Sequence, residues 1–234
     1  MPFDEPQSEI QSNSDEIIKT FDDMGLAPEL IRNIHSYGIE KPSTIQQRAI
    51  PAILSGRDVL TQDPSLSGKT LACCISAAQM VTRFGSTGQV LMIVPTREMA
   101  PPVQVIFREL CSSMDIDSYA VSTAKTVPED MKHIAEKNPR VLVGTPGRAH
   151  DAHLRGAIAV EEKVRMVIFD EVDEILSRGF GDLVGALLAS LRSGTQVVLV
   201  SCIMTPEVAD LMAKLRTDHV QIVAIRIGSQ KSEA

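Results

Sequence analysis

The fold of this chain is decided by two stretches, Asp63-Pro64-Ser65-Leu66-Ser67-Gly68-Lys69-Thr70 and Asp170-Glu171-Val172-Asp173. The first follows the candidate strand 58–62 and ends in Gly-Lys-Thr where a helix is expected to begin, the context of a phosphate-binding loop. The second follows the apolar run 164–169 and brings carboxylates to the end of a strand. Together they predict the two halves of a nucleoside triphosphate site. The alternatives are a helix N-terminus without a ligand and a solvated acidic turn.

Two residues of the first stretch oppose phosphate binding. Leu66 has a Cβ atom in a loop whose backbone needs glycine wherever φ is positive. Asp63 brings a carboxylate towards the phosphates, and at about 4 Å this repulsion costs about 1 kcal/mol in water or about 4 kcal/mol at an effective dielectric constant near 20. The residues therefore leave open whether the nucleotide site works or is impaired.

Composition and charge restrict the class of protein. The 234 residues are 44% hydrophobic and 23% charged, so we expect one globular domain, as a monomer. The polar N-terminus and the lack of a long apolar run predict an intracellular protein, in the cytoplasm or the nucleus, with no membrane segment. The net charge of −7 argues against a broad basic surface for nucleic acid. The cysteines lack metal-ligand spacing and are expected to be buried free thiols: Cys73, Cys74, Cys111 and Cys202.

Strand and helix patterns alternate along most of the chain. Seven short apolar runs are candidate strands, at 58–61, 90–94, 119–121, 141–143, 164–169, 196–200 and 220–225. Amphipathic segments lie between them, at 70–84, 99–112, 128–137, 174–192 and 206–216. Because the strands are continuously apolar, we expect a doubly wound α/β fold, with a mainly parallel sheet covered by helices on both faces. Ligands of such folds bind at the carboxyl ends of the strands.

An ordered set of motifs resembles the DEAD-box family of ATP-dependent RNA helicases. The stretch from Gly38 to Gln46 resembles the adenine-reading Q motif of that family, and the aromatic Phe21 precedes it at the expected distance. The later motifs follow in family order: Asp63 to Thr70, Pro95 to Ala100, Thr145 to Arg148, Asp170 to Asp173, and Ser201 to Ile203. The resemblance implies a RecA-like N-terminal helicase domain of the initiation factor 4A type over residues 19–228, with a flexible polar tail at 1–18 and a short tail at 229–234.

The resemblance also implies how the nucleotide would be held. The residues that would bind ATP are Phe21, Gln46, Ser65, Ser67, Gly68, Lys69 and Thr70. Phe21 would stack on the adenine, and Gln46 would form hydrogen bonds with the edge of the base. Lys69 would hold the β and γ phosphates.

The same resemblance assigns the chemistry to a few groups. Thr70 and Asp170 would hold Mg²⁺ through water, and Glu171 would polarise the attacking water. Glu171, Asp170 and Lys69 would thus be the catalytic residues. Asp173 would couple to Ser201 and link the nucleotide state to RNA.

The implied macromolecular ligand is single-stranded RNA. Its backbone would be contacted without sequence preference by Pro95, Thr96, Arg97, Thr145, Gly147 and Arg148. The alternative for the two arginines is an ordinary surface position. A helicase-regulating protein is a second possible partner.

Several positions depart from the family pattern. The family has alanine at Asp63 and glycine at Leu66, and it has a Gly-Gly pair where Ser122-Thr123 stands here. The second RecA-like domain, which supplies an arginine finger, is expected to be absent. Two hypotheses follow: an ATP-dependent RNA-remodelling domain, weak or inactive alone, or an RNA-binding or partner-docking module that has lost ATP turnover.

Overall fold

Seven strands form one parallel sheet in the computed structural model, which describes residues 17–63, 66–84, 88–121, 126–215 and 223–226. The strands are β1 (Val59–Gln62), β2 (Gln89–Ile93), β3 (Ser118–Ala120), β4 (Val141–Gly144), β5 (Val164–Phe169), β6 (Gln196–Ser201) and β7 (Val223–Arg226). Their order across the sheet is β3-β4-β2-β5-β6-β1-β7, and every neighbouring pair is parallel. The predicted doubly wound, RecA-like α/β fold is confirmed.

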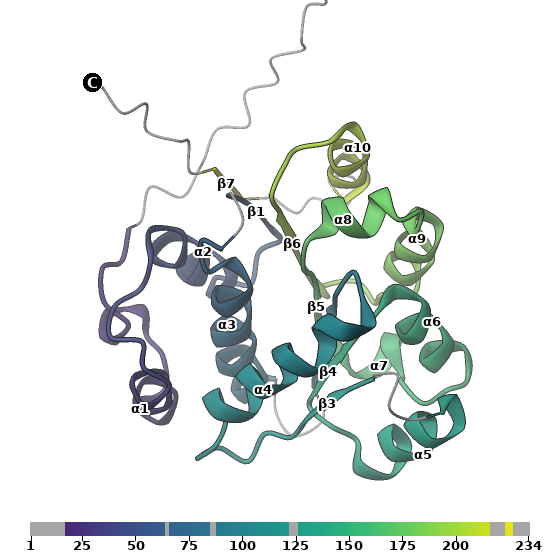
Figure 1. Ribbon diagram of the computed structural model, residues 1–234, viewed down its shortest axis with the longest axis horizontal. Helices are drawn as coiled ribbons and strands as arrows, with labels where there is room; N and C mark the ends of the chain where they lie inside the picture. Colours follow the sequence, from purple (N-terminus) through teal and green to yellow (C-terminus); the bar gives the residue numbers. More distant parts are fainter. Residues whose placement is uncertain (1–16, 64–65, 85–87, 122–125, 216–222, 227–234) are drawn as a thin grey trace, which may run out of the picture.

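Helices cover both faces of the sheet (Figure 1). One side carries α1 (Pro28–Ser36), α2 (Thr44–Leu54), α3 (Lys69–Arg83) and α4 (Ala100–Leu110). The other side carries α5 (Val127–Lys137), α6 (Pro146–Leu154), α7 (Val160–Lys163), α8 (Val172–Ser177), α9 (Gly181–Ala189) and α10 (Pro206–Leu215). Two short 3-10 helices, η1 (Asp22–Met24) and η2 (Arg97–Met99), precede α1 and α4.

The continuous apolar strands supply two separate cores. Successive side chains of a strand point to opposite faces, so Val90 and Met92 of β2 join the core under α1 to α4. Leu91 and Ile93 of the same strand join the core under the helices of the opposite side. All four side chains are at most 1% exposed. Because both faces of the strands are buried, their sequences do not alternate between polar and apolar residues.

The predicted helix at 174–192 is wrong. The chain instead forms two helices there, because α8 ends at Ser177 and α9 begins at Gly181. Gly179, between them, has φ +82°, a left-handed conformation that a helix cannot continue through. The apolar spacing persists across this break, which is why periodicity alone did not reveal it. The expected strand residues 220–222 lie outside the described part of the chain.

The ends of the strands determine where the motifs meet. The phosphate loop follows β1, the acidic stretch follows β5, and the third motif closes β6. Strand β6 lies between β1 and β5, with Gln62 in register with Ser201 and Phe169 with Leu199. Three sequence-distant motifs therefore share the carboxyl edge of three consecutive strands.

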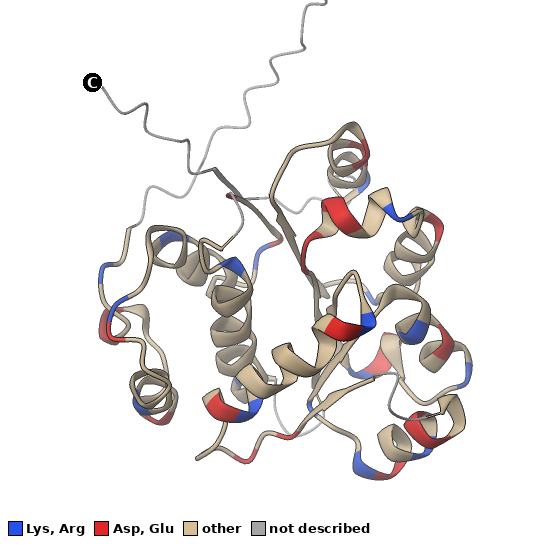
Figure 2. Cartoon of the chain, in the orientation of Figure 1, with Lys and Arg blue, Asp and Glu red and all other residues tan. Residues whose placement is uncertain are grey.

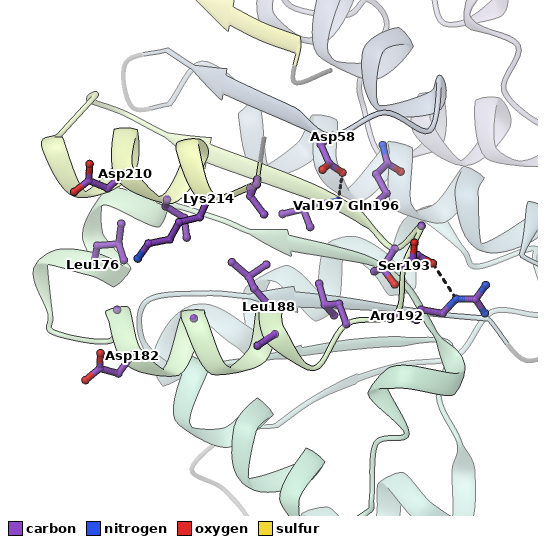
Figure 3. Close-up of a pocket in the computed structure, with 18 of the residues that line it drawn as sticks. Asp58, Leu176, Asp182, Leu188, Arg192, Ser193, Gln196, Val197, Asp210 and Lys214 are labelled. Atoms are coloured by element: carbon purple, nitrogen blue, oxygen red, sulfur yellow. Dashed lines mark hydrogen bonds between the residues drawn. The ribbon is translucent and has the colours of Figure 1, made fainter. Parts of the chain in front are cut away.

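A cavity of about 700 Å³ lies at the opposite edge, where β1 and β6 begin (Figure 3). Leu176 of α8, Leu188 of α9 and Leu211 of α10 line it, and Asp58 lies at its inner end. The Asp58 carboxylate accepts a hydrogen bond of 2.7 Å from the Val197 N–H, while burial raises its pKa. Among the residues that the structure describes, no predicted site residue lines this cavity.

Charges are dispersed over the surface. In the view of Figure 2, lysines and arginines are spread over several helices, as are aspartates and glutamates. Within the described residues, no helix is both long and apolar enough to cross a membrane. Cys73, Cys74 and Cys111 are buried free thiols as predicted, but Cys202 is partly exposed at the end of β6.

Candidate functional site

Thr70 and Asp170 form the centre of the candidate site. The Thr70 hydroxyl, in the first turn of α3, donates a hydrogen bond of 2.7 Å to Asp170 Oδ2, although the residues are 100 positions apart. Asp170 is 1% exposed, and its Oδ1 is buried without a hydrogen-bond partner among the described residues. An acceptor buried this way is costly unless a cation or water meets it. The pair therefore fits the hydroxyl and carboxylate of a hydrated Mg²⁺ site.

The charge state of Asp170 reflects its burial. Loss of solvent raises the pKa of this carboxyl from 3.8 to about 6, and the nearby Glu171 carboxylate also raises it. The hydrogen bond from Thr70 and the ammonium group of Lys69 oppose that rise. A buried carboxylate with raised pKa gains most from a bound cation, because the cation offsets the desolvation of the charged form.

Lys69 turns back onto its own loop. It is the first residue of α3 and only 6% exposed. Its Nζ donates to the Asp63 carbonyl oxygen and lies 3.4 Å from Ser67 Oγ. A phosphate oxygen would have to replace these loop oxygens at the ammonium group. Asp63 itself is 8% exposed, and its N–H donates to the Ser201 carbonyl at 3.3 Å.

Helix α2 holds the phosphate loop through two side chains. Ser43 Oγ donates to the Ser67 carbonyl at 2.9 Å, and Gln46 Nε2 donates to the Gly68 carbonyl at 3.1 Å. Gln46 Oε1 accepts from the Ser43 N–H at 2.9 Å, which completes a capping box at the start of α2. Gly68 has φ +95°, and a Cβ there would lie 2.6 Å from Gln46 Nε2. Glycine is therefore required at this contact.

Backbone strain is concentrated around the nucleotide site. Three described residues other than glycine have positive φ: Leu66 at 65°, Glu171 at 52° and Asn138 at 47°. Asn138 ends helix α5, a position where asparagine is common. Leu66 and Glu171 instead lie in the two predicted catalytic stretches, where such conformations cost about 1–3 kcal/mol. The side chain of Leu66 is fully exposed.

The predicted adenine-binding residues are buried. The ring of Phe21 is 1% exposed, packs in the core beside α1 and meets His35 edge-on at 6.4 Å. Gln46 is 3% exposed. In this conformation Phe21 offers no open face to a base, so stacking on adenine would require its segment to move. Ser65 lies outside the described residues.

Asp173 reaches the third motif through the backbone. Its Oδ2 accepts hydrogen bonds of 3.2 Å from the N–H groups of both Cys202 and Ile203. The Ser201 hydroxyl donates instead to the Ile203 carbonyl at 2.6 Å. The predicted coupling of Asp173 to Ser201 is thus indirect in this structure, through the turn that follows β6. Two backbone N–H groups thus join the acidic stretch to the end of β6.

The first predicted RNA-binding stretch follows β2. Pro95 is buried, Thr96 is partly buried at the start of η2, and Arg97 is exposed. The structure thus places Arg97 where a phosphate could approach it.

The second predicted RNA-binding stretch begins α6. Thr145 precedes the helix and is 8% exposed, and Gly147 is partly buried. The side chain of Arg148 is 14% exposed and lies 3.6 Å from Asp130 of α5. Arg148 is therefore not an ordinary surface arginine. Ser122-Thr123 lie outside the described residues.

Sequence reasoning missed three residues that support the site. Ser43 was passed over as part of a motif, although a serine three positions before a glutamine at a helix start signals a capping box. Asp130 and Tyr119 carry no local signal, because their contacts with each other and with Arg148 arise from packing of β3, α5 and α6. Only the tertiary structure could reveal them.

Comparisons with known proteins agree with this geometry. The family described as DEAD/DEAH box helicase matches residues 43–211. The ATP-dependent RNA helicase eIF4A of Chaetomium globosum is 40% identical over 220 residues, 94% of this chain and 55% of that protein. The protein of the same name from Neosartorya fischeri is 42% identical over 218 residues, 93% of this chain and 54% of that protein. The chain spans about half the length of these relatives.

Two solved structures share the fold at 28% sequence identity. A DEAD box protein from Methanococcus jannaschii superposes with a TM-score of 0.81, over 90% of this chain and 57% of that one. S. cerevisiae Dbp5, bound to Gle1 and IP6, superposes with a TM-score of 0.77, over 90% of this chain and 53% of that one. Motifs, fold and relatives coincide, and the chain therefore belongs to the DEAD/DEAH box helicase family as an eIF4A-like N-terminal domain.

Proposed function

We propose that this chain binds Mg²⁺–ATP and RNA as the N-terminal module of ATP-dependent RNA remodelling. The observation that carries the proposal is the hydrogen bond of 2.7 Å between Thr70 and Asp170, beside Lys69. The other carboxylate oxygen of Asp170, Oδ1, is buried and has no hydrogen-bond partner among the described residues. This arrangement supports a hydrated cation between α3 and the end of β5. Its relatives are named ATP-dependent RNA helicases, which agrees with the proposal.

The residues of the chain divide the work of nucleotide binding. Lys69 moves from the Asp63 carbonyl to the β and γ phosphates, and the N–H groups at the start of α3 meet the phosphate oxygens. Thr70 and Asp170 would hold a hydrated Mg²⁺, and the ion would supply positive charge to neutralise the phosphates. Glu171, at the edge of the same site, holds and polarises the attacking water. Gln46 reads the adenine edge from α2.

RNA binds across the helices that follow β2 and β4. Arg97 at η2 and Arg148 at α6 meet phosphates, and Thr96 and Gly147 provide backbone N–H groups for the same strand. Backbone contacts of this kind carry no sequence preference. The dispersed charges of Figure 2 agree with a contact limited to these points. We place this activity inside the cell, in the cytoplasm or nucleus, with a regulatory protein as a further partner, as in the complex of Dbp5 with Gle1.

A second candidate function is an RNA-binding or docking module with impaired ATP turnover. Leu66 favours it, because its φ of 65° is strained for leucine and its side chain is fully exposed beside the loop. The contact of Lys69 with the Asp63 carbonyl points the same way, because it ties up the phosphate-binding ammonium. Both features lie in the loop, while the Thr70–Asp170 pair is intact.

Isothermal titration separates the two candidates. ADP and ATP with Mg²⁺ are titrated into the wild type, into Asp63→Ala with Leu66→Gly, and into Lys69→Ala. Micromolar binding by the wild type that the double change does not improve would contradict an impaired site. Absence of binding until both residues are changed would contradict a working one. Lys69→Ala serves as the control, because heat that survives this change comes from elsewhere on the protein.

A further inference from the structure

A buried polar network joins β3, α5 and α6. The Tyr119 hydroxyl of β3 donates a hydrogen bond of 2.7 Å to Asp130 Oδ1 of α5. Asp130 Oδ2 lies 3.6 Å from Arg148 Nη1 of α6. The ring of Tyr119 stacks on His133, with the ring centroids 4.1 Å apart. The Asp130 carboxylate is thus fixed from one side by tyrosine and faces arginine on the other.

Burial makes this network more than a surface ion pair. Asp130 is 1% exposed, and its partner Arg148 is 14% exposed. A buried carboxylate is costly unless it is paired, so Asp130 depends on Tyr119 and Arg148. Removing one partner of such a pair leaves an uncompensated charge. The geometry therefore confines the guanidinium of Arg148 to the side of α6 that faces α5.

The contact between Arg148 and Asp130 is an ion pair without a good hydrogen bond. At 3.6 Å, Arg148 Nη1 is too far for a good hydrogen bond, and among the described residues it has no hydrogen-bond acceptor. Arginine has five N–H donors in a planar fork that suits phosphate oxygens. Asp130 thus holds the guanidinium electrostatically at the buried Nη1, and the donors open to another anion are those on the part of the side chain that stays exposed, 14% of it.

We infer that Asp130 is a positioning residue that holds Arg148 in place for an RNA phosphate, with Tyr119 fixing Asp130 in turn. The inference rests on the proposed function, because Arg148 acts this way only if RNA passes along the start of α6. Tyr119 belongs to β3 and Asp130 to α5, so the network also ties these two elements to the start of α6.

The inference is tested by whether one substitution strengthens or weakens RNA binding. Asp130→Asn removes a negative charge near the RNA, so a purely electrostatic effect would tighten binding. A positioning role predicts the opposite, because the released guanidinium loses its orientation. The control is Asp151→Asn on α6, the helix that carries Arg148, which removes a charge from the exposed ion pair of Asp151 with Arg155 at 2.7 Å. We expect the control to bind RNA as tightly as the wild type, or slightly more tightly.

The measurement is fluorescence anisotropy of a labelled oligouridylate titrated with the full chain at several low KCl concentrations. Arg148→Gln should weaken binding about tenfold, the loss expected for one charge-assisted contact, and lower the salt slope by about 0.7. Asp130→Asn should weaken binding at least about threefold with a similar fall in slope. In the Arg148→Gln background, Asp130→Asn should have no further effect, because Asp130 acts through Arg148.

Tyr119→Phe keeps the test decisive if Asp130→Asn does not fold. It keeps the stacked ring and removes only the hydroxyl that fixes Asp130, so we expect weaker RNA binding by a smaller factor. If Arg148→Gln weakens binding while neither other change does, the positioning role is wrong and the proposed RNA contact stands. If the wild type does not bind the oligouridylate, or Arg148→Gln has no effect, the proposed role of Arg148 in RNA binding fails, and the inference fails with it.

Discussion

Thr70 and Asp170 meet through a hydrogen bond of 2.7 Å although their strands, β1 and β5, are not neighbours in the sheet. The first turn of α3 reaches across the end of β6 to the carboxylate that follows β5. This contact connects the phosphate loop with the acidic stretch. Its energetics can be tested in the chain without ligands.

Thr70→Ala should destabilise the fold by about 1–3 kcal/mol, the range for leaving a buried acceptor without its donor. The hydrogen bond from Thr70 lowers the pKa of Asp170, so its loss should also raise that pKa further. Thr70→Ser keeps the hydroxyl and is the matched control. Urea unfolding at neutral pH measures both variants. Equal midpoints for Thr70→Ala and the wild type would show that the contact adds no stability.

Stability should depend on pH through Asp170. The folded-state pKa of about 6 is above the ordinary value of 3.8, so the folded state binds this proton more tightly than the unfolded chain does. The contribution of Asp170 to stability is therefore full below the ordinary pKa and is lost as pH rises through 6. At about 1.4 kcal/mol per pKa unit, the loss is about 3 kcal/mol.

Asp170→Asn isolates this effect, because it removes the titration while keeping the acceptor oxygen for Thr70. The difference in unfolding free energy between wild type and Asp170→Asn should fall by about 2–3 kcal/mol between about pH 4 and about pH 7. Urea unfolding in metal-free buffer at four pH values measures it. A difference that stays constant over this range would show that Asp170 has an ordinary pKa.

Leu66→Gly should stabilise the fold by about 0.5–1 kcal/mol. Left-handed backbone costs leucine about 1–2 kcal/mol, and the greater freedom of glycine in the unfolded chain offsets about 0.5–1 of that gain. No packing is lost, because the Leu66 side chain is fully exposed. Leu66→Ala is the control and should not stabilise, since it keeps the Cβ atom that causes the strain. Thermal unfolding measures the stability of both variants. Equal gains in stability would show that backbone strain at Leu66 is not the cause.

Gly68→Ala should destabilise the fold by about 1–3 kcal/mol through strained backbone and a close contact. The added Cβ would lie 2.6 Å from Gln46 Nε2 at a residue whose φ is +95°. Gly185→Ala, in helix α9, is the matched control, because nothing lies within 4 Å of its Cβ position. This control should gain up to about 1 kcal/mol of helix propensity. If both variants lose similar stability, the Gln46 contact is not the cause.

Particular residues show how far sequence reasoning reached. The run 164–169 was predicted as a doubly covered strand, and Met166 and Val167 do enter opposite cores. The helix predicted at 174–192 failed because apolar spacing continues across the left-handed Gly179. Phe21 has the spacing of an adenine-binding aromatic, but spacing cannot reveal that its ring is 1% exposed. Buried partners such as Asp130 and Arg148 come from different helices, so no local pattern predicts them.

The sequence by itself determined the family, the parallel α/β architecture and the residues able to carry the chemistry. These follow from residue type, spacing and apolar runs, which are local properties of the chain. Only the tertiary structure decided the partners: Thr70 with Asp170 across β6, Lys69 with its own loop carbonyl, and Asp130 with Arg148. The physical reason is that strand order and burial bring together groups that are distant in sequence, and burial also raises the pKa of Asp170.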